Sequence, residues 1–242
     1  HEHTHLSGRT PSLSNSTPVR SLGAPNDIAH IVARLLINAN LAGHDSHGVL
    51  RTPMYLNRIS AGRMNPAAEP TTVRETVTTI VLDGNQGPGH LTAYRALHKA
   101  MEKARCSEIC SVSFTQIEHI GRLGEYAEIA ARAGFVGITM VGRGHPNTMK
   151  VLPFGGRKGS LGTNPIAVGV PTSDEVPFVL DVATSVVAEG KLQVARSKNL
   201  PIADHILVDK NNKPTTNPND FYDGGYLRTF AEHKGYAFSL LT

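Results

Sequence analysis

Tryptophan is absent from this 242-residue sequence, cysteine occurs only twice, and aromatic residues make up only 5% of it. Two cysteines cannot build the disulfide framework of a small secreted domain. Cys106 and Cys110 also lack the Cys-x-x-Cys spacing of redox motifs and zinc sites. We therefore expect two reduced thiols in an intracellular protein.

Long apolar runs are also missing. No stretch of about 18 consecutive apolar residues occurs, which predicts that no helix spans a membrane. Residues 1–20 contain no apolar secretory segment and are polar and rich in serine and threonine, so we expect residues 1–23 to form a disordered tail. The chain begins without methionine. We expect a cytoplasmic protein, although a basic, serine-rich start is also compatible with an organellar transit peptide.

Charge of either sign is sparse, with 24 Lys and Arg against 20 Asp and Glu, for a net charge of +4. The basic residues are scattered and form no continuous stripe, so we expect no nucleic-acid partner. A small positive excess suits an anionic small-molecule substrate or cofactor. A hydrophobic content of 40% is sufficient for a substantial core.

Apolar residues follow two different periods along the chain. Spacings of three and four residues predict helices over 26–42, 92–105 and 122–133, a weaker helix from Pro53 to Gly62, and a helix starting within 233–242. Short apolar runs predict strands over 78–83, 109–115, 135–141, 166–172 and 177–183, with a loop over 84–90. The last two strands leave no room for a crossover helix and should be antiparallel. We therefore predict an α/β protein in which helices pack on a mixed sheet.

The segment GHDSHGVLR, residues 43–51, concentrates ionisable side chains at the end of the first predicted helix. His47 is a candidate general acid/base, because imidazole takes up and releases a proton near neutral pH. Ser46 could orient that ring or bind a substrate oxygen, and Arg51 could hold a carboxylate through two parallel hydrogen bonds. Together they favour a 2-hydroxy or 2-keto acid as substrate. The alternative is a surface turn with incidental polar residues.

Two glycine-containing segments are candidate ligand loops. EHIGRLGEYA, residues 118–127, follows a predicted strand and opens a helix, so Gly121 and Arg122 could approach a phosphate at the helix N-terminus, with His119 nearby. FGGRKGSLGTNP, residues 154–165, could surround a ligand with backbone N–H groups. Neither segment matches the G-x-G-x-x-G fingerprint of a Rossmann site, and each is also compatible with a glycine-rich connection.

Motifs for metal binding and for serine hydrolases are absent. No Cys and His residues have zinc-finger spacing, and no G-x-S-x-G segment occurs, so we expect no metal site. Asp181, Lys191 and the HKG segment at 233–235 are, taken singly, more typical of solvated surface charges.

Several short motifs nevertheless occur together in a fixed order: GHDSHGVLR, H-G--G-YA, PFGG, LGTNPIA, LD-ATS, GK, PTT-P and HKGY. In this order and at these separations they resemble the type-2 malate/L-lactate dehydrogenase family over roughly residues 24–242. That family also holds ureidoglycolate, sulfolactate and related 2-hydroxy-acid dehydrogenases, and the Δ1-piperideine-2-carboxylate reductases. The resemblance implies a homodimeric oxidoreductase that uses NAD or NADP and has a non-Rossmann cofactor domain.

The resemblance also implies roles for single residues. Ser46 and His47 match the family's Ser-His pair, with His47 as proton donor and acceptor, and Arg51 matches the arginine that binds the substrate carboxylate. His119 matches a histidine that lines the cofactor in some members and is the proton acceptor in the ureidoglycolate enzymes. Thr163 matches a substrate-contacting threonine, and Lys191 joins the catalytic set. The implied cofactor-binding residues are His119, Gly121, Arg122, Leu123, Asp181, Val182, Ala183 and Lys234.

The family's organisation implies three parts in this chain. These are the tail at 1–23, a small helical substrate-side domain over 24–75 that is joined by 230–242, and an NAD(P)-binding α/β domain over 76–229.

The chain departs from the family pattern in four respects. Lys191 stands where the imine reductases have aspartate, which favours a 2-hydroxy-acid dehydrogenase over a cyclic-imine reductase. Ala231 and Glu232 replace the usual glycine pair and place a carboxylate near Lys234. The segment 142–150 is longer than the usual loop. The family's C-terminal third is missing, which leaves open a truncated, non-catalytic relative that binds cofactor or a partner subunit.

Overall fold

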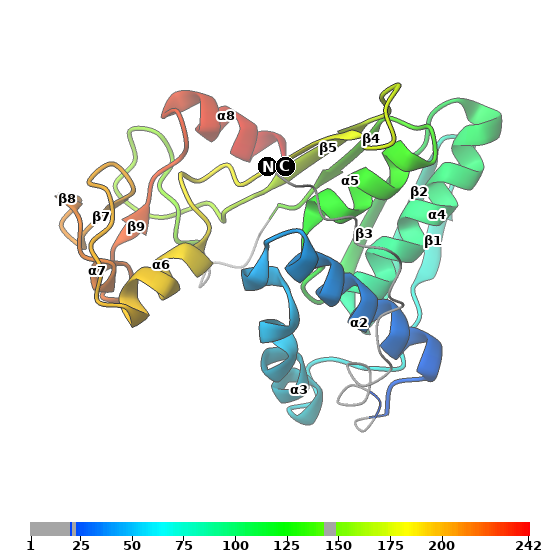
Figure 1. Cartoon of the computed structure of the whole chain (residues 1–242), viewed down its shortest axis with the longest axis horizontal. Helices are drawn as coiled ribbons and strands as arrows, with labels where there is room; N and C mark the ends of the chain where they lie inside the picture. The colour runs from blue at the N-terminus through cyan, green and yellow to red at the C-terminus, as the bar shows by residue number, and fades with distance from the viewer. Residues whose placement is uncertain (1–19, 21–22, 143–148) are drawn as a thin grey trace, which may run out of the picture. The chain divides into compact units, whose positions relative to one another are not determined.

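The computed structural model describes residue 20 and residues 23–142 and 149–242 (Figure 1). Nearly all of the expected N-terminal tail and most of the long 142–150 loop therefore lie outside the described residues. The chain divides into two compact units, His1–Tyr126 and Ala127–Thr242. The domain boundaries implied by the family's organisation stay a prediction.

The first unit opens with helices whose ends follow local sequence signals. Helix α2 (Asn26–Leu41) starts directly after Pro25, and Gly43 turns the chain away with a φ of +77° that favours glycine. Two 3-10 turns follow, η2 (Asp45–His47) and η3 (Val49–Arg51), and then helix α3 (Thr52–Ser60) with a proline in its first turn. Both expected helices are confirmed.

A three-stranded sheet completes the first unit. Strands β1 (Thr71–Glu75) and β2 (Thr79–Gly87) are antiparallel, and β2 is parallel to β3 (Ser111–Ile117). Helix α4 (Gly89–Ser107) is the crossover between the two parallel strands. The prediction of a loop over 84–90 is wrong. Strand β2 continues to Gly87 with an irregular register after Asp83, and α4 begins at Gly89. Gly89 lies so close to Glu118 that a Cβ would be 1.9 Å from the Glu118 carbonyl oxygen, so only glycine can start the helix there.

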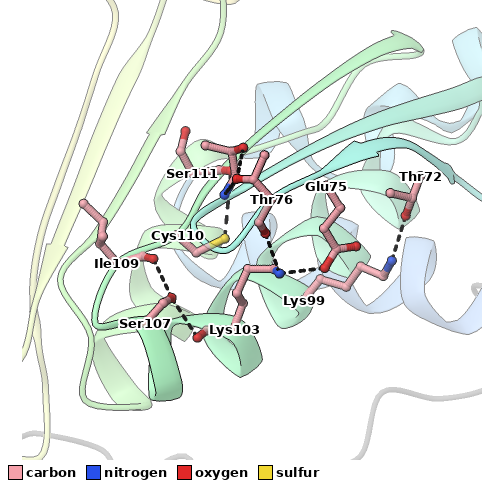
Figure 2. A network of polar contacts seen from close by, with 10 residues as sticks. Thr72, Glu75, Thr76, Lys99, Lys103, Ser107, Ile109, Cys110 and Ser111 are labelled. Carbon is pink, nitrogen blue, oxygen red and sulfur yellow. Dashed lines mark hydrogen bonds and ion pairs between the residues drawn. The ribbon is translucent and has the colours of Figure 1, made fainter.

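Lysines along α4 fasten the helix to the edge strand (Figure 2). Lys99 Nζ donates to Thr72 Oγ1 at 2.9 Å, and Lys103 Nζ forms an ion pair with Glu75 at 2.7 Å and donates to the Thr76 carbonyl at 2.8 Å. At the end of the helix, Ser107 Oγ donates to the carbonyl oxygens of Lys103 and Ile109. Both cysteines are free thiols.

The second unit is built around an antiparallel sheet. Strands β4 (Gly137–Met140), β5 (Ile166–Val170) and β6 (Phe178–Val182) pair in that order, which confirms the expected antiparallel pair. Helix α5 (Leu123–Arg132) packs closely on this sheet, because a Cβ on Gly169 would lie 2.1 Å from the Ala127 carbonyl oxygen.

The rest of the second unit consists of short elements that the periodicity did not indicate, apart from the last helix. They are α6 (Glu189–Ser197), β7 (Leu207–Val208), β8 (Pro214–Thr215), α7 (Asn219–Tyr222), β9 (Tyr226–Leu227) and α8 (His233–Leu241). Strand β7 lies between β8 and β9 and pairs antiparallel with both. Their core contains the fully buried Leu192, Leu207 and Leu227.

The prediction of an α/β protein is confirmed, whereas the single mixed sheet is wrong. The described strands form three sheets of three strands, and only β1–β3 combines parallel and antiparallel pairs. Hydrophobic periodicity identifies strands, but it carries no information on which strands share hydrogen bonds. No helix in the described ranges is both long and apolar enough to cross a bilayer.

Candidate functional site

The GHDSHGVLR segment forms two 3-10 turns that join α2 to α3. Asn40 holds this connection, because its amide nitrogen donates to the Asp45 carboxylate and its amide oxygen accepts from the Val49 N–H at 2.9 Å. Gly48 packs against the same asparagine, and a Cβ at Gly48 would lie 2.2 Å from Asn40 Oδ1. These contacts give the connection a fixed shape.

The segment brings Ser46, His47 and Arg51 together. Ser46 Oγ lies 2.9 Å from His47 Nδ1, within hydrogen-bond distance. The Arg51 side chain folds back, and its Nε donates to the Ser46 carbonyl oxygen at 2.5 Å. The terminal nitrogens of Arg51 have no hydrogen-bond or ion-pair partner among the described residues, so they are available to a ligand.

His119 reaches this group from the end of β3. Its ring stacks on that of His47, with centroids 5.4 Å apart and planes inclined by 26°. The hydroxyl of Tyr55, in α3, lies 2.8 Å from His119 Nδ1, and the backbone N–H of Gly121 donates to the same nitrogen at 3.3 Å. Burial, followed by the charges of His90, His47, Arg51 and Arg58, holds the pKa of His119 well below its ordinary value.

His90 also lies beside Tyr55 and His119, and the sequence reasoning missed it. It lies in the first turn of α4, is 2% exposed, and contacts the rings of both Tyr55 and His119 edge-on. Its Nε2 has no hydrogen-bond partner within the described residues. Burial, and then His47, lower its pKa to about 4, so this ring is neutral at physiological pH. We call His47, Tyr55, His90 and His119 the histidine cluster.

Polar contacts fix the EHIGRLGEYA segment beside this cluster. Arg58 in α3 forms an ion pair with Glu118, and Asn38 in α2 donates to Glu125 at 2.8 Å. The hydroxyl of Tyr126 donates to the Ile120 carbonyl at 2.5 Å. Gly121 has a φ of +79°, and a Cβ there would lie 2.5 Å from His90 Nε2, so the loop can approach the cluster only through glycine.

Arg122, an expected cofactor residue, forms a salt bridge with Glu125 at 3.1 Å, and their side chains are only 10% and 12% exposed. Its neighbour Leu123 is buried at the first position of α5. The charge of Arg122 is thus compensated inside the protein. No group of three or more His, Cys, Asp or Glu among the described residues is arranged to hold a metal ion.

The remaining expected residues lie in the second unit and are linked mainly through backbone. The Thr163 carbonyl accepts from both the N–H and the hydroxyl of Thr184, at 2.9 and 3.1 Å. The Thr184 carbonyl in turn accepts from the Phe230 N–H, which places Thr163 and Ala183 close to the start of α8. Asp181 and Val182 end β6, opposite Ala167 and Ile166.

The two expected lysines of this unit are exposed. Lys234 lies in the first turn of α8 and Lys191 in α6. The structure thus brings His47, Ser46, Arg51 and His119 together, and separately links Thr163 to the start of α8.

Comparison with known proteins identifies the family of this chain. The model of the malate/L-lactate dehydrogenase family matches residues 16–242. The chain belongs to that family. Among its relatives, hydroxycarboxylate dehydrogenase B of Escherichia coli (strain K12) is 42% identical over 225 residues, which cover 92% of this chain and 62% of that protein.

Solved structures of the family share the fold. Malate dehydrogenase from Entamoeba histolytica superposes with a TM-score of 0.89 at 30% identity, over 96% of this chain and 68% of that one. The Δ1-piperideine-2-carboxylate reductase from Pseudomonas syringae pvar. tomato gives a TM-score of 0.89 at 28% identity, over 97% and 71%. The chain spans about 62% of the length of the E. coli dehydrogenase that it matches.

Proposed function

We propose that this member of the malate/L-lactate dehydrogenase family transfers a hydride between a 2-hydroxy acid and the nicotinamide of NAD or NADP. The observation that carries the proposal is that Ser46 contacts both a proton-transfer group and a carboxylate-binding group. Its hydroxyl lies 2.9 Å from His47 Nδ1, and its carbonyl oxygen accepts from Arg51 Nε at 2.5 Å.

His47 is the proposed acid/base. Ser46 contacts its ring at Nδ1, and we assign to Nε2 the exchange of a proton with the C2 oxygen of the substrate. In the oxidation, His47 accepts the hydroxyl proton while the hydride leaves C2. General acid/base catalysis of this kind contributes about 10²–10⁴-fold to the rate.

Arg51 is the proposed carboxylate ligand. Its Nε is held by the Ser46 carbonyl, so the guanidinium plane is oriented before the substrate arrives. A guanidinium binds a carboxylate through two parallel hydrogen bonds and fixes the direction of the attached C2–H bond. This arrangement suits malate, lactate and sulfolactate alike.

A nicotinamide cofactor supplies the hydride acceptor of this chemistry. The donors of the first unit fit its nicotinamide end better than its phosphates, because His119 offers an imidazole whereas Arg122 is already paired with Glu125. We propose that His119, Gly121, Arg122 and Leu123 line the cofactor.

The roles proposed in the second unit follow from the resemblance. Thr163 contacts the substrate and Lys191 belongs to the catalytic set. Asp181, Val182, Ala183 and Lys234 bind the cofactor. A helical substrate-side domain, a homodimer and a cytoplasmic location belong to the same proposal.

Reduction of a cyclic imine is a second candidate function, favoured by the similarity to the Δ1-piperideine-2-carboxylate reductase structure. Such a substrate also carries a carboxylate next to the reacting carbon, so Arg51 would serve both reactions. Lys191 disfavours this second function, because the resemblance implies an aspartate at that position in the imine reductases.

Nicotinamide absorbance tests both functions in one experiment. NADH and NADPH are each incubated with the keto acids of malate, lactate and sulfolactate and with Δ1-piperideine-2-carboxylate. We expect oxidation with at least one keto acid, and about 10²–10⁴-fold slower turnover in His47→Ala with little change in cofactor affinity. Turnover of the cyclic imine alone would select the second function. Unchanged turnover in His47→Ala would exclude His47 as the base.

A further inference from the structure

Tyr55 occupies a position between the apolar core of the first unit and the histidine cluster. Its ring is 3% exposed and packs with Ile28, Val32, Leu36 and Leu91. Only its hydroxyl is directed at a polar group, His119 Nδ1, at 2.8 Å. A tyrosine held in this way presents its hydroxyl to one atom with little freedom to move.

The second group at that atom decides which way the hydrogen bond runs. The Gly121 N–H lies 3.3 Å from His119 Nδ1, and a backbone N–H can only donate. His119 Nδ1 must therefore carry a lone pair, and the Tyr55 hydroxyl, which can donate or accept, is the donor in its own contact. A neutral imidazole with a lone pair on Nδ1 has its proton on Nε2.

We propose that Tyr55 is a positioning residue that, with the Gly121 N–H, holds His119 as the neutral Nε2–H tautomer. His119 then serves the proposed dehydrogenase as a hydrogen-bond donor, and the base is His47. The assignment of the base rests on the proposed function, whereas the tautomer rests on the hydrogen bonds alone.

The surroundings of His119 act in the same direction. Burial and the neighbouring His90, His47, Arg51 and Arg58 all lower the pKa of His119. Protonation would place a hydrogen on Nδ1, directly against the Gly121 N–H. Burial also raises the pKa of Tyr55, although Arg51 and Arg58 oppose this, so the phenol keeps the proton that it donates.

A fixed Nε2–H has a definite chemical use. It can donate to a substrate oxygen or to the carboxamide oxygen of the nicotinamide. It cannot accept a hydroxyl proton, because Nε2 is already protonated and Nδ1 accepts from Tyr55 and Gly121. His47 has a different environment, since its Nδ1 faces a hydroxyl that can donate or accept. The stacked pair therefore divides into a donor and a base.

Nitrogen-15 NMR of the chain labelled at histidine tests the tautomer without any turnover. His119→Gln identifies the His119 signals among the 12 histidines by difference. Near neutral pH we expect an unprotonated Nδ1 and a protonated Nε2. A proton on Nδ1, a mixture of tautomers or an imidazolium would overturn the proposal.

The role of Tyr55 is tested by Tyr55→Phe, with Tyr94→Phe as the matched control. Tyr94 lies in α4 and contacts His98 and Arg34, outside the cluster. In Tyr55→Phe we expect the Nδ1–H tautomer of His119 to appear and the pKa of His119 to rise, because one donor to the neutral ring is lost. Tyr94→Phe should leave both unchanged. Unchanged His119 signals in Tyr55→Phe would show that Tyr55 does not position the ring.

Kinetics separate the donor from the base once a substrate turns over. Glutamine retains an N–H donor but cannot act as a base. In the oxidation of the 2-hydroxy acid, where the base must be unprotonated, His119→Gln should therefore lower kcat while the loss of rate at acidic pH persists, whereas His47→Gln should abolish that pH dependence. Loss of the acidic limb in His119→Gln would make His119 the base and overturn the assignment. If no substrate turns over, the proposed function fails, and the NMR result still decides the tautomer.

Discussion

The histidine cluster of the first unit and the start of α8 in the second both use the left-handed region of backbone conformation, but with different residues. In the cluster, Gly121 has a φ of +79°, and His90 occupies the space that a side chain would need. Before α8, Ala231 and Glu232 have φ values of 42° and 54° although both carry side chains. The first region thus has the residue that its conformation requires, and the second does not.

This difference separates a consistent site from a strained one. Around His119, the backbone conformation, the packing of Tyr55 and the hydrogen bonds all favour one arrangement. At Glu232, with φ 54° and ψ −114°, the surrounding structure imposes a conformation that disfavours any residue with a Cβ. The family resemblance implies a glycine pair at these two positions. The backbone of Ala231 and Glu232 still has the positive φ values that glycine favours.

Adding a methyl group at Gly121 should have the largest effect on stability. In Gly121→Ala, the Cβ would lie 2.5 Å from His90 Nε2 and the residue would keep a φ of +79°. The left-handed conformation costs about 1–2 kcal/mol and overpacking a similar amount, so we expect a loss of about 3 kcal/mol in the free energy of unfolding. Denaturant titration measures it.

Gly62→Ala is the matched control, because Gly62 has a φ of +65° and no neighbouring atom lies within 4 Å of the place that a Cβ would take. It should show the conformational cost alone, about 1–2 kcal/mol. Equal losses in the two variants would mean that His90 does not fill the space beneath Gly121.

Replacing the proposed carboxylate-binding group, Arg51, should have the next largest effect. Arg51→Lys keeps the charge but loses both the anchor on Ser46 and the paired hydrogen bonds to a carboxylate. Charged hydrogen bonds are worth about 1.5–3 kcal/mol, so we expect kcat/KM for a keto acid to fall about 10- to 100-fold. Arg63→Lys, at an exposed position of the same unit, should leave kcat/KM unchanged. Equal kinetics in Arg51→Lys would remove Arg51 from the substrate site.

The neutral, buried His90 predicts a pH dependence of stability. Its pKa is about 4 in the folded protein and about 6.5 when unfolded, so the unfolded state binds more protons between these values. The stability is therefore fully present above pH 6.5 and is lost as the pH falls toward 4. Between pH 7 and pH 5 we expect a loss of about 2 kcal/mol from this ring, seen by denaturant titration at each pH.

His90→Leu should reduce this slope without abolishing it, because His119 has a lowered pKa and acts in the same direction. His98→Gln, at an exposed position of the same helix, should retain the slope of the unmodified chain. An unchanged slope in His90→Leu would mean that His90 does not titrate on unfolding.

Local signals in the sequence were sufficient for the elements with strong periodicity. Helix α2 was expected over 26–42 and runs from Asn26 to Leu41, because Pro25 and Gly43 mark its ends. Strand β1 was missed because all five of its residues are exposed, which leaves no alternation to detect. Strands β7, β8 and β9 have only two residues each, too few for any period.

The site was predictable only where its residues are adjacent in the chain. Ser46, His47 and Arg51 belong to one motif, and His119 was found through another. Tyr55 and His90 were missed because packing, and not spacing, brings them to His119 from α3 and α4. No signal in the sequence pointed to His90, because residue 90 fell in the expected loop over 84–90 and α4 begins at Gly89.

Relieving the strain before α8 should have the smallest effect, and of opposite sign. Glu232→Gly allows the same φ of 54° without a Cβ, so we expect the free energy of unfolding to rise by about 1 kcal/mol despite the greater freedom of glycine in the unfolded chain. Glu232→Ala removes the carboxylate but keeps the Cβ, and it should give no such gain in denaturant titration. Equal gains in both variants would assign the effect to loss of the Glu232 carboxylate and not to relief of the backbone. The two regions would then differ in electrostatics and not in backbone strain.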